Sequence, residues 1–216
     1  MSDNNVSATL RYLVRWEGKP IYIASRGGAD AALRIGADFE DHTVTIHDAR
    51  QLQQPAALDR QGFALTAQET SVEDFYALEN YRDVYDAEIT ELVLQATGAV
   101  EALVFDHTLR SDSADVRGAR TTREPASVIH NDYTDNSARQ RLRDLLPAAE
   151  AERRLLRRFA VINVWRSAKG PVLNSPLACC DAATLADADL IASERRAAER
   201  IGELQLVTWN AAHQWY

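Results

Sequence analysis

The sequence predicts a mainly β protein with flanking helices, built on a jelly-roll core in which two sheets enclose a pocket. Two observations carry this prediction. Segments rich in β-branched and aromatic residues recur along the chain and are separated by turns. In addition, His130 and Asp132 have the spacing of same-face neighbours on one strand, and His213 follows another strand-like segment much later in the chain. We therefore expect these two strands to lie side by side.

The strands are expected in the following order. Residues 9–23 are apolar and aromatic and are broken by the turn at residues 18–20 (GKP). In residues 43–47, Val44 and Ile46 share one face. Further strands are expected at residues 100–109, 128–134, 159–166 and 204–209. The polar residues 111–125 have no apolar rhythm, which predicts a mobile loop at the mouth of the pocket.

Two stretches, about 69–99 and 137–159, have the apolar spacing of helices. In the first, Ser71 is the expected N-cap and Gly98 the expected C-terminal stop. In the second, Pro147 is expected to start a separate helix. We expect these helices to pack outside the barrel, as an elaboration of a single domain that spans residues 1–216.

Composition limits the possible functions. The chain has 216 residues, is 46% hydrophobic and 26% charged, and can bury a substantial core. A net charge of -8 without a basic run argues against nucleic-acid binding, and no apolar run approaches the ~20 residues of a membrane span. The first residues lack the features of a signal peptide, and the adjacent Cys179 and Cys180 disfavour a disulfide. We expect a cytoplasmic protein that acts on a small molecule, with no membrane partner and an oligomeric state that the sequence does not indicate.

The candidate metal ligands are His130, Asp132 and His213. Two imidazoles and one carboxylate are the ligand set of non-haem Fe(II) sites, which leave one face open for O₂ and a co-substrate. An H-x-D tripeptide also occurs by chance in many proteins. The same ligand set serves zinc hydrolases, but no general base stands out beside these residues, so we favour iron.

Several motifs together resemble one family. They are residues 41–50 (DHTVTIHDAR), 105–110 (FDHTLR), 130–134 (HNDYT), 162–166 (INVWR), 175–181 (SPLACCD) and 210–216 (NAAHQWY). In this order they resemble the CmcJ/NvfI-type oxygenases, also called the AsaB-like hydroxylase/desaturase family. The resemblance implies a jelly-roll Fe(II)/2-oxoglutarate oxygenase. It also implies hydroxylation, desaturation or a related oxidation, often in natural-product biosynthesis.

The resemblance implies that His130, Asp132 and His213 are the facial triad. Asn163 and Arg166 match a family signature and are the candidate cofactor-binding residues, because arginine can bind a carboxylate as a bidentate fork. A structural ion pair is the alternative role for this arginine. The candidate substrate-pocket residues are His107, Arg110, Tyr133 and Trp165.

The binding of the far carboxylate of 2-oxoglutarate is not explained by the sequence. In the fold that the resemblance implies, a basic residue on the strand after the distal histidine usually binds it, whereas the printed chain ends at Tyr216. Three interpretations stay open: the co-substrate is bound differently, the chain is shortened, or the co-substrate site has been lost. The functional alternatives are a non-haem iron oxygenase that does not use 2-oxoglutarate, and a non-catalytic jelly-roll protein that binds a small molecule.

Overall fold

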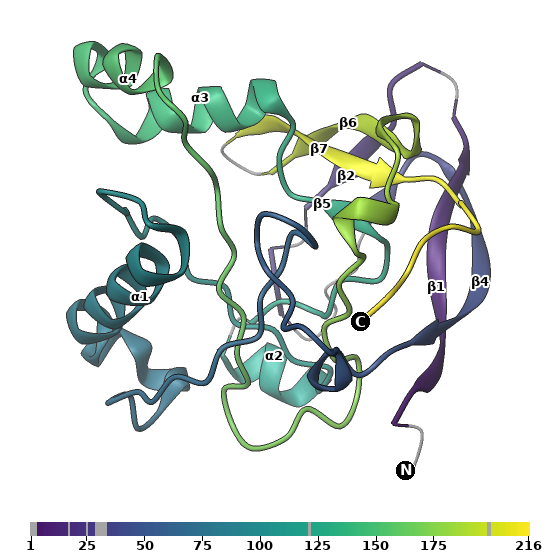
Figure 1. Ribbon diagram of the computed structural model, residues 1–216, viewed down its shortest axis with the longest axis horizontal. Coiled ribbons are helices and arrows are strands. Elements are labelled where there is room, and N and C mark those ends of the chain that lie inside the picture. The colour runs from purple at the N-terminus through teal and green to yellow at the C-terminus, as the bar shows by residue number, and fades with distance from the viewer. Residues whose placement is uncertain (1–3, 17, 25, 29–33, 121, 198–199) are drawn as a thin grey trace.

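The computed structural model describes residues 4–16, 18–24, 26–28, 34–120, 122–197 and 200–216. Its strands form two sheets (Figure 1). In the smaller sheet, β1 (Val6–Arg15) pairs antiparallel with β4 (Asp38–Ile46). The larger sheet has the order β3-β2-β6-β7-β5. Its strands are β3 (Arg34–Ile35), β2 (Ile21–Ile23), β6 (Leu190–Arg196), β7 (Ile201–Val207) and β5 (His130–Asn131).

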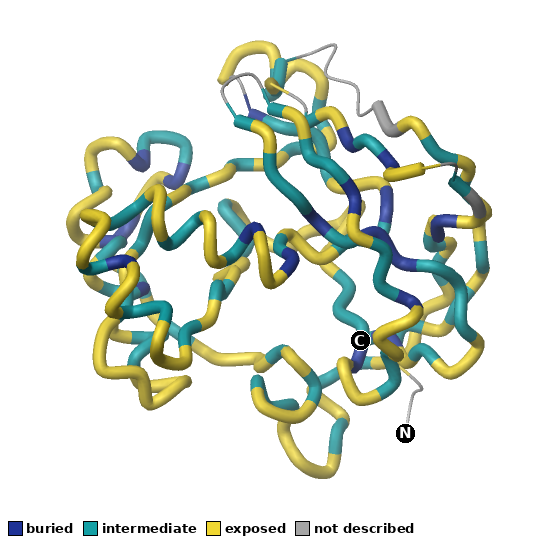
Figure 2. Tube along the Cα trace, turned by 90° about the horizontal axis from the view of Figure 1, so that it is seen from above, coloured by how far each residue is buried: buried dark blue, intermediate teal, exposed yellow. Residues whose placement is uncertain are grey.

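The two sheets meet where β1 lies against the end of β7. Leu13 forms a parallel bridge with Thr208 at this junction. Because neighbouring residues of a strand point to opposite faces, the pair Tyr12 and Leu13 serves two different hydrophobic clusters. Leu13 packs with the cluster of Tyr22, Val128, Leu204 and Leu206, and Tyr12 packs with the cluster of Val207 and Trp215. The core is thus divided between the two faces of the junction, and the buried stretches of Figure 2 are correspondingly short.

The α-helices lie away from the β1–β4 sheet, with α1 and α4 at the left, α3 at the top and α2 at the bottom of the view (Figure 1). They are α1 (Arg82–Thr97), α2 (Ala114–Arg120), α3 (Asp135–Leu145) and α4 (Ala148–Leu155). Short 3₁₀ helices occur at η1 (Ala49–Gln51), η2 (Phe75–Asn80), η3 (Ala182–Thr184) and η4 (Asp187–Asp189). A third hydrophobic cluster joins η2 to α1 through Phe75, Leu78, Tyr85 and Ile89. Among the described residues, no helix is both long and apolar enough to span a membrane.

Local signals in the sequence agree with several element ends. Gly98 ends α1 in the left-handed conformation, with φ +67°, and its N–H donates to the carbonyl of Leu94. Pro147 is the N-cap residue of α4, and the turn at residues 18–20 separates β1 from β2. The expected cap at Ser71 is wrong. Asp74 caps η2 instead, because its carboxylate accepts from the N–H of Tyr76.

Two expected strands are absent from the described residues. Residues 100–109 and 159–166 run without pairing to a sheet. The apolar residues of the second segment alternate but do not pack on a sheet, and Trp165 is accordingly 50% exposed. This segment belongs to the long connection that follows α4 and passes between the helices and the sheets (Figure 1). The polar stretch 111–125, expected to be a loop, contains the helix α2.

Candidate functional site

His130 and Asp132 are brought together at the edge strand β5. This strand pairs with β7, with His130 opposite Leu206 and Asn131 opposite Gln205. The Asn131 amide donates to the Gln205 side chain at 2.8 Å and to the Tyr133 carbonyl at 2.9 Å, which fixes the backbone between the two candidate ligands. His130 Nε2 lies 3.4 Å from Asp132 Oδ1.

The protonation of His130 follows from its second neighbour. Its Nδ1 lies 2.9 Å from the Val128 carbonyl, and because a carbonyl only accepts, Nδ1 carries a proton. In neutral His130, the Nε2 lone pair would therefore face a carboxylate oxygen. Such an arrangement is repulsive unless a cation stands between the two atoms, and this cation is either a proton or a metal ion.

The electrostatics of the pair agree with that geometry. Burial lowers the pKa of His130, but the hydrogen bonds to Asp132 and to the Val128 carbonyl outweigh burial and raise it. The hydrogen bond from His130 holds the pKa of Asp132 at about 2, against the opposing effect of burial. Asn163 Nδ2 donates to Asp132 Oδ2 at 2.6 Å and also favours the carboxylate. Asp132 is 45% exposed at its side chain, so it stays accessible to an ion from solvent.

The expected pocket residues lie at different distances from this pair. The charge of Arg110 lowers the pKa of Asp132, and its guanidinium donates to the Glu124 carbonyl at 2.8 Å. Tyr133 is half-buried beside the pair, whereas Trp165 is half exposed. His107 is bound elsewhere, with Nε2 2.7 Å from the Asp86 carboxylate.

Arg166 lies with the helical cluster. Its guanidinium carbon is 5.0 Å from the centre of the Phe75 ring, and its charge also acts on Tyr85 and Glu88. No contact joins Arg166 to His130 or Asp132 in the described parts of the chain. Its Nε is buried without a hydrogen-bond partner there.

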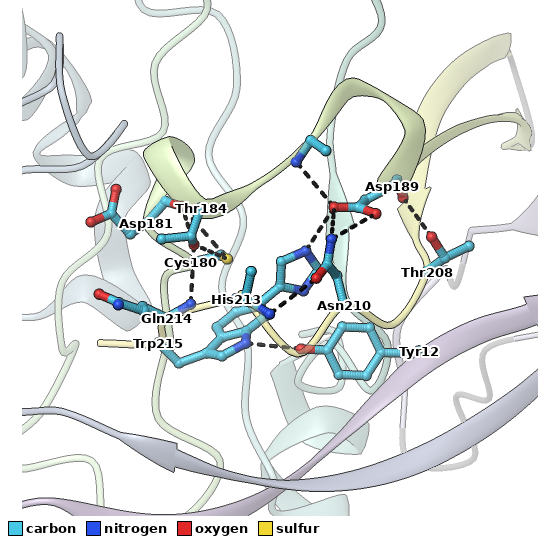
Figure 3. A network of polar contacts seen from close by, with 12 residues as sticks. Tyr12, Cys180, Asp181, Thr184, Asp189, Thr208, Asn210, His213, Gln214 and Trp215 are labelled. Atoms are coloured by element: carbon cyan, nitrogen blue, oxygen red, sulfur yellow. Dashed lines mark hydrogen bonds and ion pairs between the residues drawn. The ribbon is translucent and has the colours of Figure 1, made fainter.

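His213 has a different partner from the one expected. Its Nε2 lies 3.1 Å from Asp189 Oδ2, and the side chain is fully buried (Figure 3). Asn210 Nδ2 donates to the same carboxylate oxygen at 3.1 Å, and the N–H of Ala186 donates at 3.0 Å. The His213 ring also stacks on Tyr12, with the ring centres 5.8 Å apart.

The network around His213 fastens the last residues of the chain to both neighbouring segments. Trp215 Nε1 donates to the buried Tyr12 hydroxyl at 2.9 Å, and the N–H of His47 donates to the Trp215 carbonyl. On the other side, Cys179 and Tyr216 exchange two backbone hydrogen bonds. The contacts around Asp189, Asn210 and Trp215 (Figure 3) therefore hold the C-terminal residues against their neighbours, and we call this network the structural clasp.

The expected three-ligand site is consequently not assembled. No group of three or more His, Cys, Asp or Glu side chains that could hold a metal ion occurs in the portion of the chain that the structure describes. His213 lies apart from this pair: its Nε2 contacts Asp189 and its ring stacks on Tyr12, whereas its Nδ1 is buried without a hydrogen-bond partner among the described residues. Asp189 could not be predicted from the sequence, because the Ala-Asp-Ala-Asp stretch, residues 186–189, has no motif that indicates a contact with a histidine near residue 213. Tyr22, whose ring centre is 6.0 Å from that of His130, was also missed, because it sits on a three-residue strand.

The comparisons with known proteins identify the family. A family model described as "Oxidoreductase/YMDC permease-like domain" matches residues 10–216. This chain belongs to that family. The resemblance to the hydroxylase/desaturase family is confirmed by its relatives. "Hydroxylase/desaturase efuI" of Hormonema carpetanum is 29% identical in an alignment 200 residues long, which covers 82% of this chain and 67% of the relative.

Two further comparisons concern one protein. "Fe(II)/2-oxoglutarate-dependent dioxygenase nvfI" of Aspergillus novofumigatus is 32% identical in an alignment 161 residues long, which covers 71% of this chain and 55% of the relative. A solved structure of the "iron and alpha-ketoglutarate-dependent endoperoxidase NvfI" matches all of this chain and 79% of that chain, with a TM-score of 0.78 and 23% identity. The chain therefore has the NvfI fold, and it spans from about half to two thirds of the length of these curated relatives.

Proposed function

We propose that this protein is an Fe(II)/2-oxoglutarate-dependent oxygenase that oxidises a small molecule in natural-product biosynthesis. The reaction would be a hydroxylation, a desaturation or a related oxidation. The names of efuI and nvfI support this proposal. The likeness to NvfI supports a jelly-roll core in a single domain. Both cysteines are free thiols, which supports a cytoplasmic location.

The observation that carries the proposal is the contact between His130 Nε2 and Asp132 Oδ1. With Nδ1 bound to the Val128 carbonyl, the lone pair of Nε2 and an accessible carboxylate oxygen converge on one point. A metal-ligating histidine is usually oriented by a carbonyl or carboxylate that accepts from its other ring nitrogen, as the Val128 carbonyl does here. His130 and Asp132 would thus hold the iron, and Asn163 would orient Asp132. When bound, iron and 2-oxoglutarate supply the activation of O₂, and the protein supplies binding and orientation.

The fit of the iron is incomplete. His130 and Asp132 suit two ligand positions, but His213 is bound to Asp189, and no described residue takes its place beside them. Arg166 packs on Phe75, and no described contact brings it to the pair. The contacts of His130 and Asp132 support metal binding, whereas the described contacts of His213 support a structural role.

The experiment is turnover of 2-oxoglutarate by the 216-residue chain. The protein is loaded with Fe(II) without oxygen, exposed to O₂, and assayed for succinate. The Asp132→Ala variant serves as the negative control. Succinate formation that disappears in this variant is expected. Equal succinate from both proteins would contradict the proposed iron site.

One observation favours a second function. Because the described residues offer two ligands rather than three, the chain could bind a small molecule without oxidising it. Iron binding without succinate, in the presence of O₂ and 2-oxoglutarate, would support this non-catalytic role or an oxygenase that uses no 2-oxoglutarate.

A further inference from the structure

A cleft lined by arginines lies beside the 3₁₀ helix η2. Its volume is about 320 Å³, and its walls come from η2, from residues 106–109 and from Arg120, Thr122 and Arg123. Four guanidinium groups line it: those of Arg26, Arg82, Arg120 and Arg123. Only two carboxylates, those of Glu79 and Asp106, accompany them. This cationic excess stands out in a chain with 32 acidic and 24 basic residues.

Three of the four guanidinium groups in the cleft lack an ion-pair partner among the described residues. The side chains of Arg26, Arg82 and Arg123 form no hydrogen bond or ion pair with any described residue. Arg120 is held against Tyr76: its guanidinium carbon lies 4.9 Å from the ring centre, and its Nη1 donates to the Tyr76 carbonyl at 3.5 Å. Because like charges that converge without compensation repel one another, an anion between them would be bound favourably. Arginine also presents two parallel N–H donors, a geometry that matches a carboxylate.

The remaining walls define the rest of the ligand. Phe75, Leu78 and Leu109 form the apolar part of the lining; the first two belong to the hydrophobic cluster of η2 and α1 and are each 8% exposed. Thr122 closes the floor. It is 3% exposed, and its hydroxyl has no partner among the described residues. A ligand that fits this lining has a carboxylate at one end and an apolar body at the other.

The cleft is separate from the His130–Asp132 pair but borders it. Arg110 and Arg123 form a parallel backbone bridge, and the carbonyl of Leu109 accepts from the N–H of Arg123. Leu109 and Arg123 line the cleft, whereas the charge of the adjacent Arg110 acts on Asp132. The bridged segments around Leu109–Arg110 and Arg123 thus connect the cleft to the candidate ligand pair.

We propose that this cleft binds the carboxylate group of a small molecule that has an apolar body. Its use for the organic substrate rests on the proposed function, whereas the binding itself requires no metal. The shared chemistry of the ligand is a carboxylate, which either the organic substrate or a dicarboxylate co-substrate could supply. The apolar wall favours the organic substrate.

Calorimetric titration of the 216-residue chain without metal tests the proposal. The probes are 3-phenylpropanoate, its neutral analogue 3-phenylpropan-1-ol, and succinate. We expect 3-phenylpropanoate to bind at one site, and the alcohol and succinate to bind at least tenfold more weakly. Equal binding of the alcohol would overturn the role of the carboxylate. Equal or tighter binding of succinate would overturn the role of the apolar wall.

Variants locate the binding. Arg82→Gln with Arg123→Gln should weaken 3-phenylpropanoate at least tenfold. The control pair Arg50→Gln with Arg60→Gln changes the net charge equally at exposed positions and should leave the affinity unchanged. The Asp132→Ala variant should also bind normally, so failure of the iron site and failure of the cleft are distinguishable. No binding by the wild-type chain, or equal loss in both arginine pairs, would refute the proposal.

Discussion

Replacing His213 by alanine should weaken the fold and leave metal binding intact. The imidazole is fully buried, stacks on Tyr12 and contacts the Asp189 carboxylate at 3.1 Å. Its removal deletes one hydrogen bond to a charged group and opens a cavity between the last residues and β1. Asp189 keeps the donors from Asn210 and Ala186, so its charge is not left without partners.

The size of the effect follows from these contacts. Loss of a hydrogen bond to a buried charged group costs about 1.5–3 kcal/mol. A partly collapsed cavity adds about 1 kcal/mol. We therefore expect the free energy of unfolding to fall by about 3 kcal/mol. For a chain of this length, this corresponds to a decrease in melting temperature of roughly 6–12 °C.

The assay is thermal unfolding followed by circular dichroism, together with titration of Co(II) as a spectroscopic stand-in for Fe(II). His47→Ala is the matched control, because it makes the same exchange at an exposed position next to the same C-terminal residues. It should change the free energy of unfolding by less than about 0.5 kcal/mol. His213→Gln, which keeps a side-chain donor, should unfold between wild type and His213→Ala. A His213→Ala protein that melts like wild type but no longer binds Co(II) would refute the clasp and restore His213 as a ligand.

Four further predictions concern Asp132, His130 and Tyr12. Asn163→Ala removes the donor to Asp132 Oδ2, so it should raise the pKa of that carboxyl and weaken Co(II) binding about three- to tenfold. The control Asn174→Ala removes a comparable exposed donor and should leave both properties unchanged. Equal effects in the two variants would contradict the role assigned to Asn163. Metal must displace the proton of His130, whose pKa is raised above 6.5, so Co(II) affinity should increase as the pH rises through that pKa. The raised pKa of His130 also stabilises the metal-free fold, and this contribution is fully present below pH 6.5. It should be lost as the pH rises through the pKa of His130 in the folded protein. The free energy of unfolding of the metal-free protein, measured by urea denaturation at a series of pH values, tests this. Tyr12→Phe leaves an indole N–H without its acceptor and should cost about 1–2 kcal/mol in urea unfolding; an unchanged midpoint would show that the hydrogen bond contributes nothing.

The strand pattern near the N-terminus could be predicted because it depends on local signals. Alternating apolar residues and the turn at residues 18–20 define β1, β2 and β4. The same pattern misled at residues 159–166, because a strand also needs a partner, and pairing is a property of the whole fold. The helix ends at Gly98 and Pro147 could be predicted because, unlike strand pairing, a helix cap depends on a few adjacent residues.

The candidate site divides in the same way. His130 and Asp132 are two residues apart, so their spacing alone brings them together on β5 and the turn that follows it. His213 is far away in sequence, and its partner was decided by the placement of Asp189 at the end of η4. Residue spacing cannot predict whether His213 contacts the carboxylate of Asp132 or that of Asp189, because both are far from it in the sequence.

The most direct test of the iron site is an anaerobic Fe(II) titration of three proteins: the wild type, Asp132→Ala and His213→Ala. We predict that the wild type and His213→Ala bind Fe(II) with affinities within about threefold of each other, and that Asp132→Ala loses binding by at least tenfold. Loss of Fe(II) binding in His213→Ala, with binding retained in Asp132→Ala, would contradict the assignment of the metal to His130 and Asp132.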